Sequence, residues 1–336
     1  MATIYEIAKK AGVSPSTVSR ALSGNGYVSK KMKEKIMAIA DEMNYRPNEL
    51  ARALVTKKSY TIGLVVADIG NPFFPALARG VEDAANVEGY NIILCNTDSN
   101  ATKAREYVRL LSSRQTDGVV FCSASVSDSH VKTVTDSGIP VVLIYPSNSL
   151  KCDMVACDNL SGGMMATEHL IGLGHTSIAI ITAKVNRITG ADRLKGYKKA
   201  LAKHNLRLND DYILDGDYSM ESGYDCTKRF LKLKDRPTAI FATNDLMAIG
   251  AINAVEDEGL KVPDDIAIVG YDDITMASFV KPKLTTVAQP KYEMGNLACK
   301  VLLDRIKKPD AQIRSTVLKP KLIVRGSSMV INTTDL

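Results

Sequence analysis

The feature that most constrains the fold is a series of short helical patterns in the first 58 residues, separated by residues that favour turns. Thr3 and Glu6 stand at the spacing of a capping box, which predicts that a helix begins directly after Thr3. Gly12 can take the positive φ that ends this helix, and Ser14 followed by Pro15 suits the start of a second helix. Two helices joined by a glycine-containing turn predict a helix-turn-helix motif, whose second helix enters the major groove of DNA.

A third helix and a short fourth segment follow this motif. After Ser29, apolar residues at helical spacing predict a helix that packs on the first two; they are Met32, Ile36, Ile39 and Met43. Asn48 can cap a further helix over residues 49–55, but isolated helices below roughly 12–15 residues are marginal in water. We therefore expect this hinge segment to be ordered by a second copy of itself and by a DNA minor groove, with Leu54 as an apolar wedge between base steps.

Several motifs of this region match a known family. They are Tyr5-x-Ile7-Ala8, Ala11-Gly12-Val13-Ser14, Thr17-Val18-Ser19-Arg20, Tyr45-x-Pro47-Asn48 and Ala51-Arg52-x-Leu54. In order and spacing they resemble the lactose/galactose-repressor family of bacterial transcription factors. The resemblance implies a homodimer that binds a pseudo-palindromic DNA operator, with Leu54 entering the minor groove at the centre of the site.

The expected DNA contacts divide by role. Ser16, Ser19 and Arg20 lie on the outer face of the second predicted helix and should read bases in the major groove, with Arg20 suited to guanine. The side chains expected to contact phosphate and set the register are Tyr5, Thr17, Asn25 and Lys30. The predicted DNA-binding set also includes Pro15 and, in the hinge, Asn48, Ala51 and Leu54.

The charge distribution supports a nucleic-acid partner for the N-terminal region. The chain carries a net charge of +6, and residues 1–58 hold 11 Lys+Arg against 5 Asp+Glu, while the remainder holds 32 of each. All of the excess positive charge therefore lies on the small N-terminal piece, as contact with DNA phosphates requires.

Cysteine usage and hydropathy indicate a cytoplasmic protein. The six cysteines show no CxxC pattern and no Cys/His spacing typical of metal ligands, so we expect buried free thiols in a reducing compartment. The N-terminus lacks an apolar signal core, and no stretch approaches the roughly 18 apolar residues that span a bilayer. We expect no metal, no cofactor and no membrane partner.

From Tyr60 onward, short apolar runs alternate with amphipathic stretches, which is typical of parallel α/β architecture. Strands are predicted over residues 61–67, 91–96, 118–123 and 140–145, and again over 177–182, 212–215, 239–243 and 266–271. Helices are predicted over 74–88, 103–113, 127–137, 160–172, 193–204, 220–232, 245–258 and 291–307, and a strand pair around 315–325. Two such doubly wound units resemble periplasmic binding proteins, in which a small ligand sits in the cleft between two lobes.

The predicted fold is therefore an all-α helix-turn-helix domain with a hinge helix, joined to a two-lobed α/β core. The expected boundaries are 1–46 for the DNA-binding domain, 47–58 for the hinge, 59–328 for the core and 329–336 for a tail. Within the core, the N-lobe is expected to comprise about 59–157 and 288–318, and the C-lobe about 158–287 and 319–328.

Candidate effector residues follow the predicted strands, because open α/β sheets bind ligands outside the carboxyl ends of their strands. The set is Asn71, Phe73, Phe74, Tyr145, Asp158, Arg187, Thr189, Arg193, Tyr218, Asn244, Asp272 and Gln289. The aromatic members could sandwich a flat ring, and the polar members could supply directional hydrogen bonds. The alternative roles are turn capping for Asp158 and Asp272 and core packing for Phe74.

Parts of this set resemble two kinds of relative. Asn71-Pro72-Phe73-Phe74 with Arg193, Asn244, Asp272 and Gln289 is similar to the pentose-binding pattern of ribose repressors, and Arg187-x-Thr189-x3-Arg193 is similar to the purine-repressor arrangement. Both relatives carry Asp where this chain has Tyr145, and the purine type follows it with Trp where this chain has Pro146. This departure leaves the choice between a sugar and a purine-like effector open.

The function predicted from the sequence is a dimeric, sequence-specific repressor of carbohydrate or nucleoside metabolism genes, controlled by a small molecule in the interlobe cleft. Ligand closure of the lobes would change the distance between the two hinge segments of the dimer. One alternative is control by a protein coregulator on the core. A sugar-binding transport protein conflicts with the basic N-terminal domain and the missing signal peptide. An enzyme is disfavoured because GxGxxG, GxxxxGK[ST] and GxSxG motifs are absent from the sequence.

Overall fold

The computed structural model describes residues 3–23, 26–45, 58–123, 126–145, 147, 149–183 and 188–329. The chain divides into two compact units, Met1–Ser59 and Tyr60–Leu336. The predicted hinge helix with Asn48, Ala51 and Leu54 lies outside the described residues, as do Asn25, Arg187 and most of the tail.

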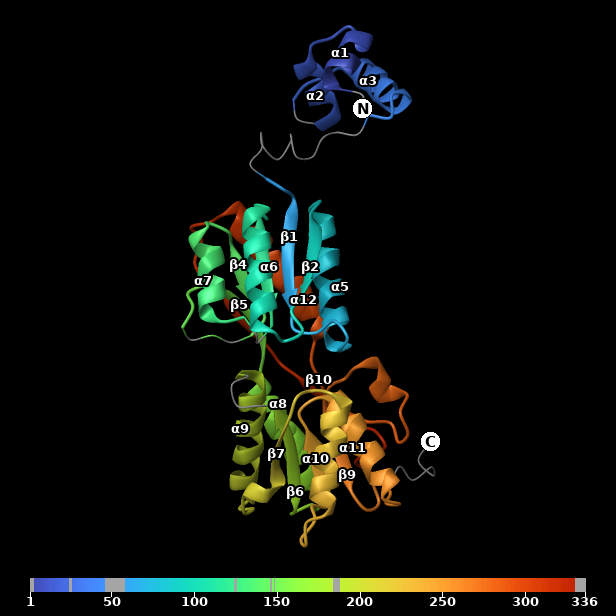
Figure 1. Cartoon of the computed structure of the whole chain (residues 1–336), viewed down its shortest axis with the longest axis vertical. Helices are drawn as coiled ribbons and strands as arrows, with labels where there is room; N and C mark the ends of the chain where they lie inside the picture. Colours follow the sequence, from blue (N-terminus) through green and yellow to red (C-terminus); the bar gives the residue numbers. More distant parts are fainter. Residues whose placement is uncertain are drawn as a thin grey trace. The chain divides into compact units, whose positions relative to one another are not determined.

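The N-terminal unit consists of three helices, α1 (Ile4–Ala11), α2 (Pro15–Ser23) and α3 (Lys30–Glu42) (Figure 1). The predicted capping box is present, because the Glu6 amide donates to Thr3 Oγ1 at 3.3 Å and the Thr3 amide donates to Glu6 Oε2 at 2.7 Å. Gly12 ends α1 with φ 74°, and the Thr17 amide donates to Ser14 Oγ at 3.2 Å. The small core formed by the three helices contains Ile7, Ala8, Ala11, Val18, Ala21, Ile36, Ile39 and Ala40.

The C-terminal unit contains two six-stranded sheets. Sheet A has the order β11-β5-β4-β3-β1-β2, with β1 (Thr61–Val66), β2 (Asn91–Asn96), β3 (Gly118–Cys122), β4 (Val141–Leu143), β5 (Asp153–Cys157) and β11 (Ser315–Leu318). Sheet B has the order β12-β10-β9-β8-β6-β7, with β6 (Ile178–Ala183), β7 (Ile213–Gly216), β8 (Ala239–Ala242), β9 (Ala267–Asp272), β10 (Thr285–Ala288) and β12 (Lys321–Ile323). All neighbouring strands are parallel except β12, which runs antiparallel to β10.

Helices cover both faces of each sheet, which buries the strands and explains their almost continuous apolar runs. On sheet A, α5 (Phe73–Val87) and α12 (Lys291–Lys307) cover one face, and α6 (Ala101–Ser113) and α7 (Asp128–Asp136) cover the other (Figure 1). On sheet B, α8 (Asn159–Gly172) and α9 (Ile188–Lys203) cover one face, and α10 (Met220–Leu231) and α11 (Asp245–Asp257) cover the other. Each sheet with its helices forms one lobe, the N-lobe on sheet A and the C-lobe on sheet B.

One strand of sheet A corrects the sequence prediction. Strand β5 was not predicted, because its run begins with a charged residue; Asp153 is buried in the structure, where Arg305 donates to both carboxylate oxygens at 2.8 and 3.0 Å. The two strands predicted around 315–325 are present and do not pair with each other, since β11 joins sheet A and β12 joins sheet B, in the lobes to which the expected boundaries assign residues 288–318 and 319–328. The chain therefore crosses between the lobes three times: after β5, after β10 and between β11 and β12.

Candidate functional site

A cleft of about 1290 Å³ lies where the carboxyl ends of the strands of both sheets meet. Its walls come from the loops after β1, β2, β3 and β4 in the N-lobe and from the segments after β6, β7, β9 and β10 around the C-lobe. This is the place where open α/β sheets bind ligands.

Arg193 is the centre of the C-lobe wall. Its side chain is only 6% exposed, and it projects from α9 into a network of polar groups. Its Nε donates to Asn159 Oδ1 at 2.8 Å, and its Nη1 donates to the Thr243 carbonyl at 2.5 Å. The guanidinium lies 3.7 Å from the centroid of the Tyr271 ring, close enough for a cation–π contact. Three separate elements thus hold one buried cation in a fixed orientation.

The backbone of Arg193 is fixed by a close helix contact. A Cβ atom on Gly163 of α8 would lie 2.2 Å from the Arg193 carbonyl oxygen, and one on Gly196 of α9 would lie 2.3 Å from the Leu160 carbonyl oxygen. Only glycine at these two positions lets α8 and α9 approach so closely. The packing of the two helices therefore sets the position of the arginine.

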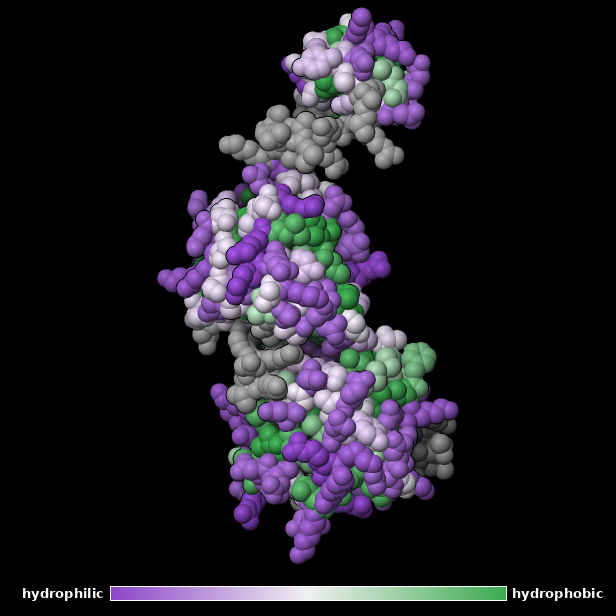
Figure 2. Space-filling view, viewed as in Figure 1, coloured by the Kyte–Doolittle hydropathy of each residue, from purple (hydrophilic) through white to green (hydrophobic). Residues whose placement is uncertain are grey.

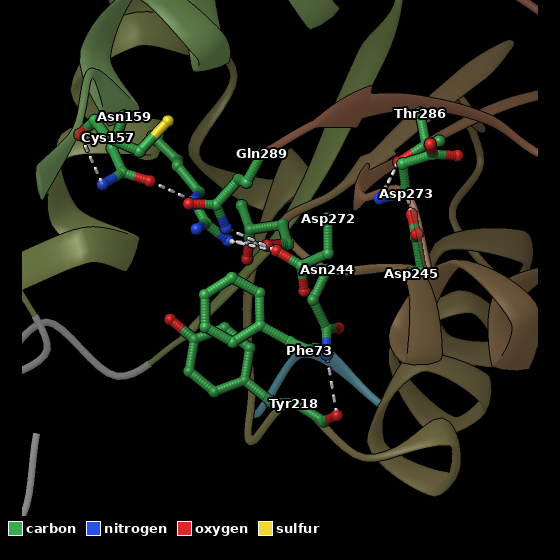
Figure 3. Close-up of polar contacts among 12 residues, drawn as sticks. Phe73, Cys157, Asn159, Tyr218, Asn244, Asp245, Asp272, Asp273, Thr286 and Gln289 are labelled. Atoms are coloured by element: carbon green, nitrogen blue, oxygen red, sulfur yellow. Dashed lines mark hydrogen bonds and ion pairs between the residues drawn. The ribbon is translucent and has the colours of Figure 1, made fainter. Parts of the chain in front are cut away.

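Asp272 lies opposite Arg193 at the end of β9. Its Oδ1 accepts a hydrogen bond from Gln289 Nε2 at 2.7 Å and lies 3.8 Å from Arg193 Nη1 (Figure 3). Burial raises the pKa of this carboxyl above its ordinary value, against the charges of Arg193 and Lys291. Asp272 and Asp273 have φ 114° and 53°, a backbone conformation that is uncommon outside glycine. Lys291 Nζ donates to the carbonyl oxygens of both residues.

Asp245 stabilises the turn that carries Asp272 and Asp273. It is fully buried, and its two oxygens accept hydrogen bonds from Thr286 Oγ1 at 2.5 Å and from the Ile274 amide at 2.8 Å. Burial and the nearby charge of Asp272 raise the pKa of Asp245 well above its ordinary value. The strained turn that carries Asp272 is therefore held from α11 and β10 as well as by Lys291.

Aromatic side chains form much of the remaining cleft wall. Phe73 and Phe74 pack edge to face with ring centroids 5.2 Å apart at the start of α5. Tyr145 contributes a neutral phenol, because burial raises its pKa above the ordinary value. Tyr218 has φ 76°, and its carbonyl accepts a hydrogen bond from Asn244 Nδ2 at 3.0 Å. These rings give the cleft flat apolar surfaces beside its polar network.

Most of the predicted effector residues meet in this cleft. Those that line it are Asn71, Phe73, Phe74, Tyr145, Thr189, Arg193, Tyr218, Asp272 and Gln289. Asp158 and Asn244 instead cap helices, since Asp158 Oδ1 accepts from the Ser161 amide at 2.9 Å and Asn244 Oδ1 accepts from the Met247 amide at 3.0 Å. Arg187 and Pro146 lie outside the described part of the chain.

The sequence prediction omits Asn159 and the wall near α7. Asn159 lines the cleft in place of the predicted Asp158. Asp158 caps α8, so its side chain turns back towards the amides of the helix. Asp128, Ser147 and Ser149 also line the cleft. Their signal in the sequence is their place after β3 and β4, where the same strand-end rule applies.

In the N-terminal unit, the residues predicted to read bases share one exposed face. Ser16, Ser19 and Arg20 are exposed at helical spacing on α2, while Val18 between them is fully buried. Tyr5 is 72% exposed and Lys30 is exposed, whereas Pro15 and Thr17 are partly buried. Hydrophilic side chains cover most of the visible surface of this unit in Figure 2.

The described residues offer no other obvious chemical centre. All six cysteines are buried free thiols, as predicted, and no group of three or more His, Cys, Asp or Glu in the described ranges is arranged to hold a metal ion. No described helix is long and apolar enough to cross a membrane.

Two family models match separate parts of the chain. "Bacterial regulatory proteins, lacI family" matches residues 3–48, and "Periplasmic binding protein-like domain" matches residues 167–328. The chain is 37% identical over 334 residues to the HTH-type transcriptional repressor PurR of Photobacterium profundum, an alignment that covers 99% of this chain and 100% of the relative.

Solved structures extend the similarity to the fold. The lac repressor dimer bound to operator and the anti-inducer ONPF matches with a TM-score of 0.89 and 27% identity, covering 98% of this chain and 99% of that one. A LacI family regulator from Enterococcus faecium with bound ribose matches with a TM-score of 0.74 and 34% identity, covering 81% of this chain and 100% of that one.

A helix-turn-helix unit joined to a two-lobed core of the periplasmic-binding-protein type defines the DNA-binding regulators that carry their own ligand-binding core. The chain belongs to the lacI family of bacterial regulatory proteins. It is a transcriptional regulator, and the fold class and family predicted from the sequence are confirmed.

Proposed function

We propose that this regulator is a repressor whose operator affinity is set by a sugar or nucleobase-like effector in the interlobe cleft. The observation that carries the proposal is the buried network of Arg193, Asn159, Asp272 and Gln289, which presents fixed polar groups beside the rings of Phe73 and Phe74. A small number of oriented polar groups within aromatic walls is the usual composition of a small-molecule site. The ribose held by the Enterococcus faecium relative supports a polyhydroxyl ligand.

The contacts proposed for the effector are those that line the cleft. Arg193, Asp272 and Gln289 would hold polar groups of the ligand, and Asn159 would orient Arg193. Tyr145, Tyr218 and the two phenylalanines would contact a ring, with Asn71 and Thr189 at the edge. Asn244 would act through Tyr218, and Arg187 is included from the sequence pattern alone. We assign the chain no catalytic step.

The proposed DNA contacts follow the exposed face of α2. Ser16, Ser19 and Arg20 would read bases, and Tyr5, Pro15, Thr17 and Lys30 would fix the register on phosphates. Asn25, Asn48, Ala51 and Leu54 complete the proposed contacts from the sequence. In a homodimer, two such units would face the two halves of a pseudo-palindromic operator.

Control would follow from the difference in effector affinity between two arrangements of the lobes. A ligand shifts such an equilibrium only by its differential affinity, and the coupling between effector and operator is reciprocal. The same cleft could therefore bind an inducer or a corepressor. Operator-binding measurements decide whether the effector lowers or raises the affinity for DNA.

A thermal-shift panel on the full-length protein tests the proposal. Pentoses, hexoses, nucleosides and nucleobases would each be added, followed by operator-binding titrations with every compound that stabilises the protein. An effector at 100 times its Kd adds about 2.7 kcal/mol, which corresponds to several degrees in Tm for domains of this size. Stabilisation with a change in operator affinity supports the proposal. Stabilisation by no compound of the panel would favour a protein coregulator instead.

A further inference from the structure

Lys291 lies at the point where the chain passes from the C-lobe back to the N-lobe. It is the first residue of α12, which packs on α5 and sheet A, and it follows the crossing after β10. A lysine at this position is unfavourable for the helix itself, because the amino end of a helix attracts negative charge and repels positive charge. The position of this cation is therefore explained by contacts outside α12.

These contacts are made with the C-lobe. The partly buried Lys291 donates through Nζ to the carbonyl oxygen of Asp272 and, at 2.8 Å, to that of Asp273. Asp272 is the last residue of β9 that pairs with β10, and both carbonyl groups belong to the turn with positive φ at the end of that strand. Carbonyl groups that leave a sheet need other donors. A helix of the N-lobe thus supplies donors to a turn of the C-lobe.

Gln289 connects the same crossing to the side chain of Asp272. Its Nε2 donates to Asp272 Oδ1 at 2.7 Å, and its carbonyl oxygen accepts from the Lys291 amide at 2.8 Å (Figure 3). Asp272 is therefore held by the crossing at its side chain and at its backbone. Asp272 and Gln289 line the cleft, whereas Lys291 is not among the described residues that do so. Lys291 is thus placed to act on a ligand through Asp272 without touching it.

The other two crossings between the lobes have different contacts. The Asp158 amide donates to the Leu318 carbonyl oxygen at 2.9 Å, which joins the crossing after β5 to the crossing between β11 and β12. This bond extends the ladder between β5 and β11 and does not involve the turn at Asp272. Among the described residues, it is the crossing after β10 that bonds to this turn.

Helix α12 also connects Lys291 to the N-lobe wall of the cleft. A Cβ atom on Gly80 of α5 would lie 2.1 Å from the Tyr292 carbonyl oxygen of α12, so only glycine allows these helices to approach so closely. Helix α5 begins with the two phenylalanines that line the cleft. An effector held between these rings and Asp272 would bridge the same two parts of the molecule that Lys291 joins.

We propose that Lys291 is a positioning residue that couples effector binding at Asp272 to the arrangement of the two lobes, and thereby to operator affinity. The inference rests on the proposed function of the cleft and adds a residue through which it is regulated. When the lobes rotate about the crossing after β10, the amino group of Lys291 moves with α12, while its two carbonyl partners move with sheet B. Its hydrogen bonds therefore stabilise one arrangement more than another, and the arrangements differ in their affinity for both ligands.

Three variants of the full-length protein test the inference. Lys291→Met removes the donors, Lys291→Arg keeps N–H donors, and Lys300→Met is the matched control at an exposed position of the same helix. Operator affinity is titrated without effector, on DNA selected for binding to the parent. We expect Lys291→Met to change this affinity at least about fivefold, the lower end of the usual coupling between sites. Lys300→Met should match the parent, and Lys291→Arg should lie closer to the parent than Lys291→Met does.

Isothermal titration calorimetry measures the other half of the coupling. D-ribose, D-glucose and adenosine are titrated into the parent and into each variant. Because coupling is reciprocal, the Kd of any compound that binds the parent should change at least about fivefold in Lys291→Met and stay within about twofold in Lys300→Met. A role in stability alone would lower the urea midpoint of Lys291→Met and leave both affinities of the folded protein unchanged. That result would overturn the inference.

The outcomes also separate this inference from the proposed function. Equal operator affinities of Lys291→Met and Lys300→Met, together with a compound that alters the operator affinity of the parent, would refute the role of Lys291 and leave the proposed function standing. A changed operator affinity of Lys291→Met, with no compound that binds the parent, would support the coupling between the lobes and count against a small-molecule effector.

Discussion

The two surfaces proposed to bind DNA and the effector differ in how much they contribute to the stability of the fold. On α2, Ser16, Ser19 and Arg20 are exposed, and the small core of the N-terminal unit lies behind them. In the cleft, Arg193 and Asp272 are buried and hydrogen-bonded to Asn159 and Gln289. Asp245, behind the cleft wall, is buried and accepts a hydrogen bond from the Ile274 amide. We therefore expect substitutions on the proposed DNA-reading face to change the free energy of unfolding little, whereas the proposed effector site also stabilises the C-lobe.

Of the variants considered, Arg193→Ala should cause the largest loss of stability. It leaves Asp272 as a buried carboxylate without its cation, and breaking a buried pair costs about 3–5 kcal/mol. Urea unfolding of the full-length protein would measure this loss. Lys198→Ala, exposed on the same helix, should stay within about 0.5 kcal/mol of the parent. Equal stability of the two variants would show that Arg193 does not stabilise the C-lobe.

Gly163→Ala tests whether helix packing positions the arginine. The added methyl group would lie 2.2 Å from the Arg193 carbonyl oxygen, so α8 and α9 must separate. We expect a loss of about 1–3 kcal/mol and weaker binding of any compound found in the panel. Gly172→Ala in the same helix α8 meets no atom within 4 Å and should be neutral or slightly stabilising. Similar Tm values for both variants would show that α8 and α9 tolerate the added atom.

Asp245 gives the buried site a dependence on pH. Its pKa is raised in the folded protein, so the unfolded chain ionises first, near the ordinary value of 3.8. Stability is therefore lost as the pH rises from below that value towards the raised pKa. Asp245→Asn removes this pH-dependent loss of stability. As the pH rises from 4 to 8, the urea midpoint of the variant should therefore rise relative to that of the parent. A constant difference across this range would refute the assignment.

Arg20→Ala should have the smallest effect on folding. The side chain is exposed, so the unfolding free energy should change by less than about 0.5 kcal/mol. Binding to a selected operator should lose about 1–3 kcal/mol of discrimination at one base pair. A binding assay over single-base operator variants would measure this loss, and urea unfolding would measure the stability. Uniform weakening on all sequences would show that Arg20 contacts phosphate instead of a base.

What could be predicted from the sequence is what local spacing determines. The Thr3–Glu6 capping box, the Gly12 turn and the long apolar strands are encoded by residues within a few positions of one another, and all are present. The strand-end rule likewise placed most of the predicted effector residues in the cleft, because parallel strands bring their carboxyl ends to one edge.

The remaining features depend on partners far away in the chain. Strand β5 starts at a buried aspartate that is neutralised by Arg305, and no local pattern reveals that pairing. Whether Asp158 or Asn159 faces the cleft depends on where α8 begins, a shift of one residue.

The threefold crossing between the lobes has a consequence for biosynthesis. Sheet A begins with β1 but is completed by α12 and β11, which follow nearly all of sheet B in the chain. During synthesis on the ribosome, the N-lobe is therefore the first lobe to begin, but it is completed only after most of the C-lobe. Until residue 307 has emerged, the apolar face of α5 lacks its partner helix α12. A chain truncated before Lys291 would retain five strands of each sheet, yet one face of sheet A would keep α5 and lose α12.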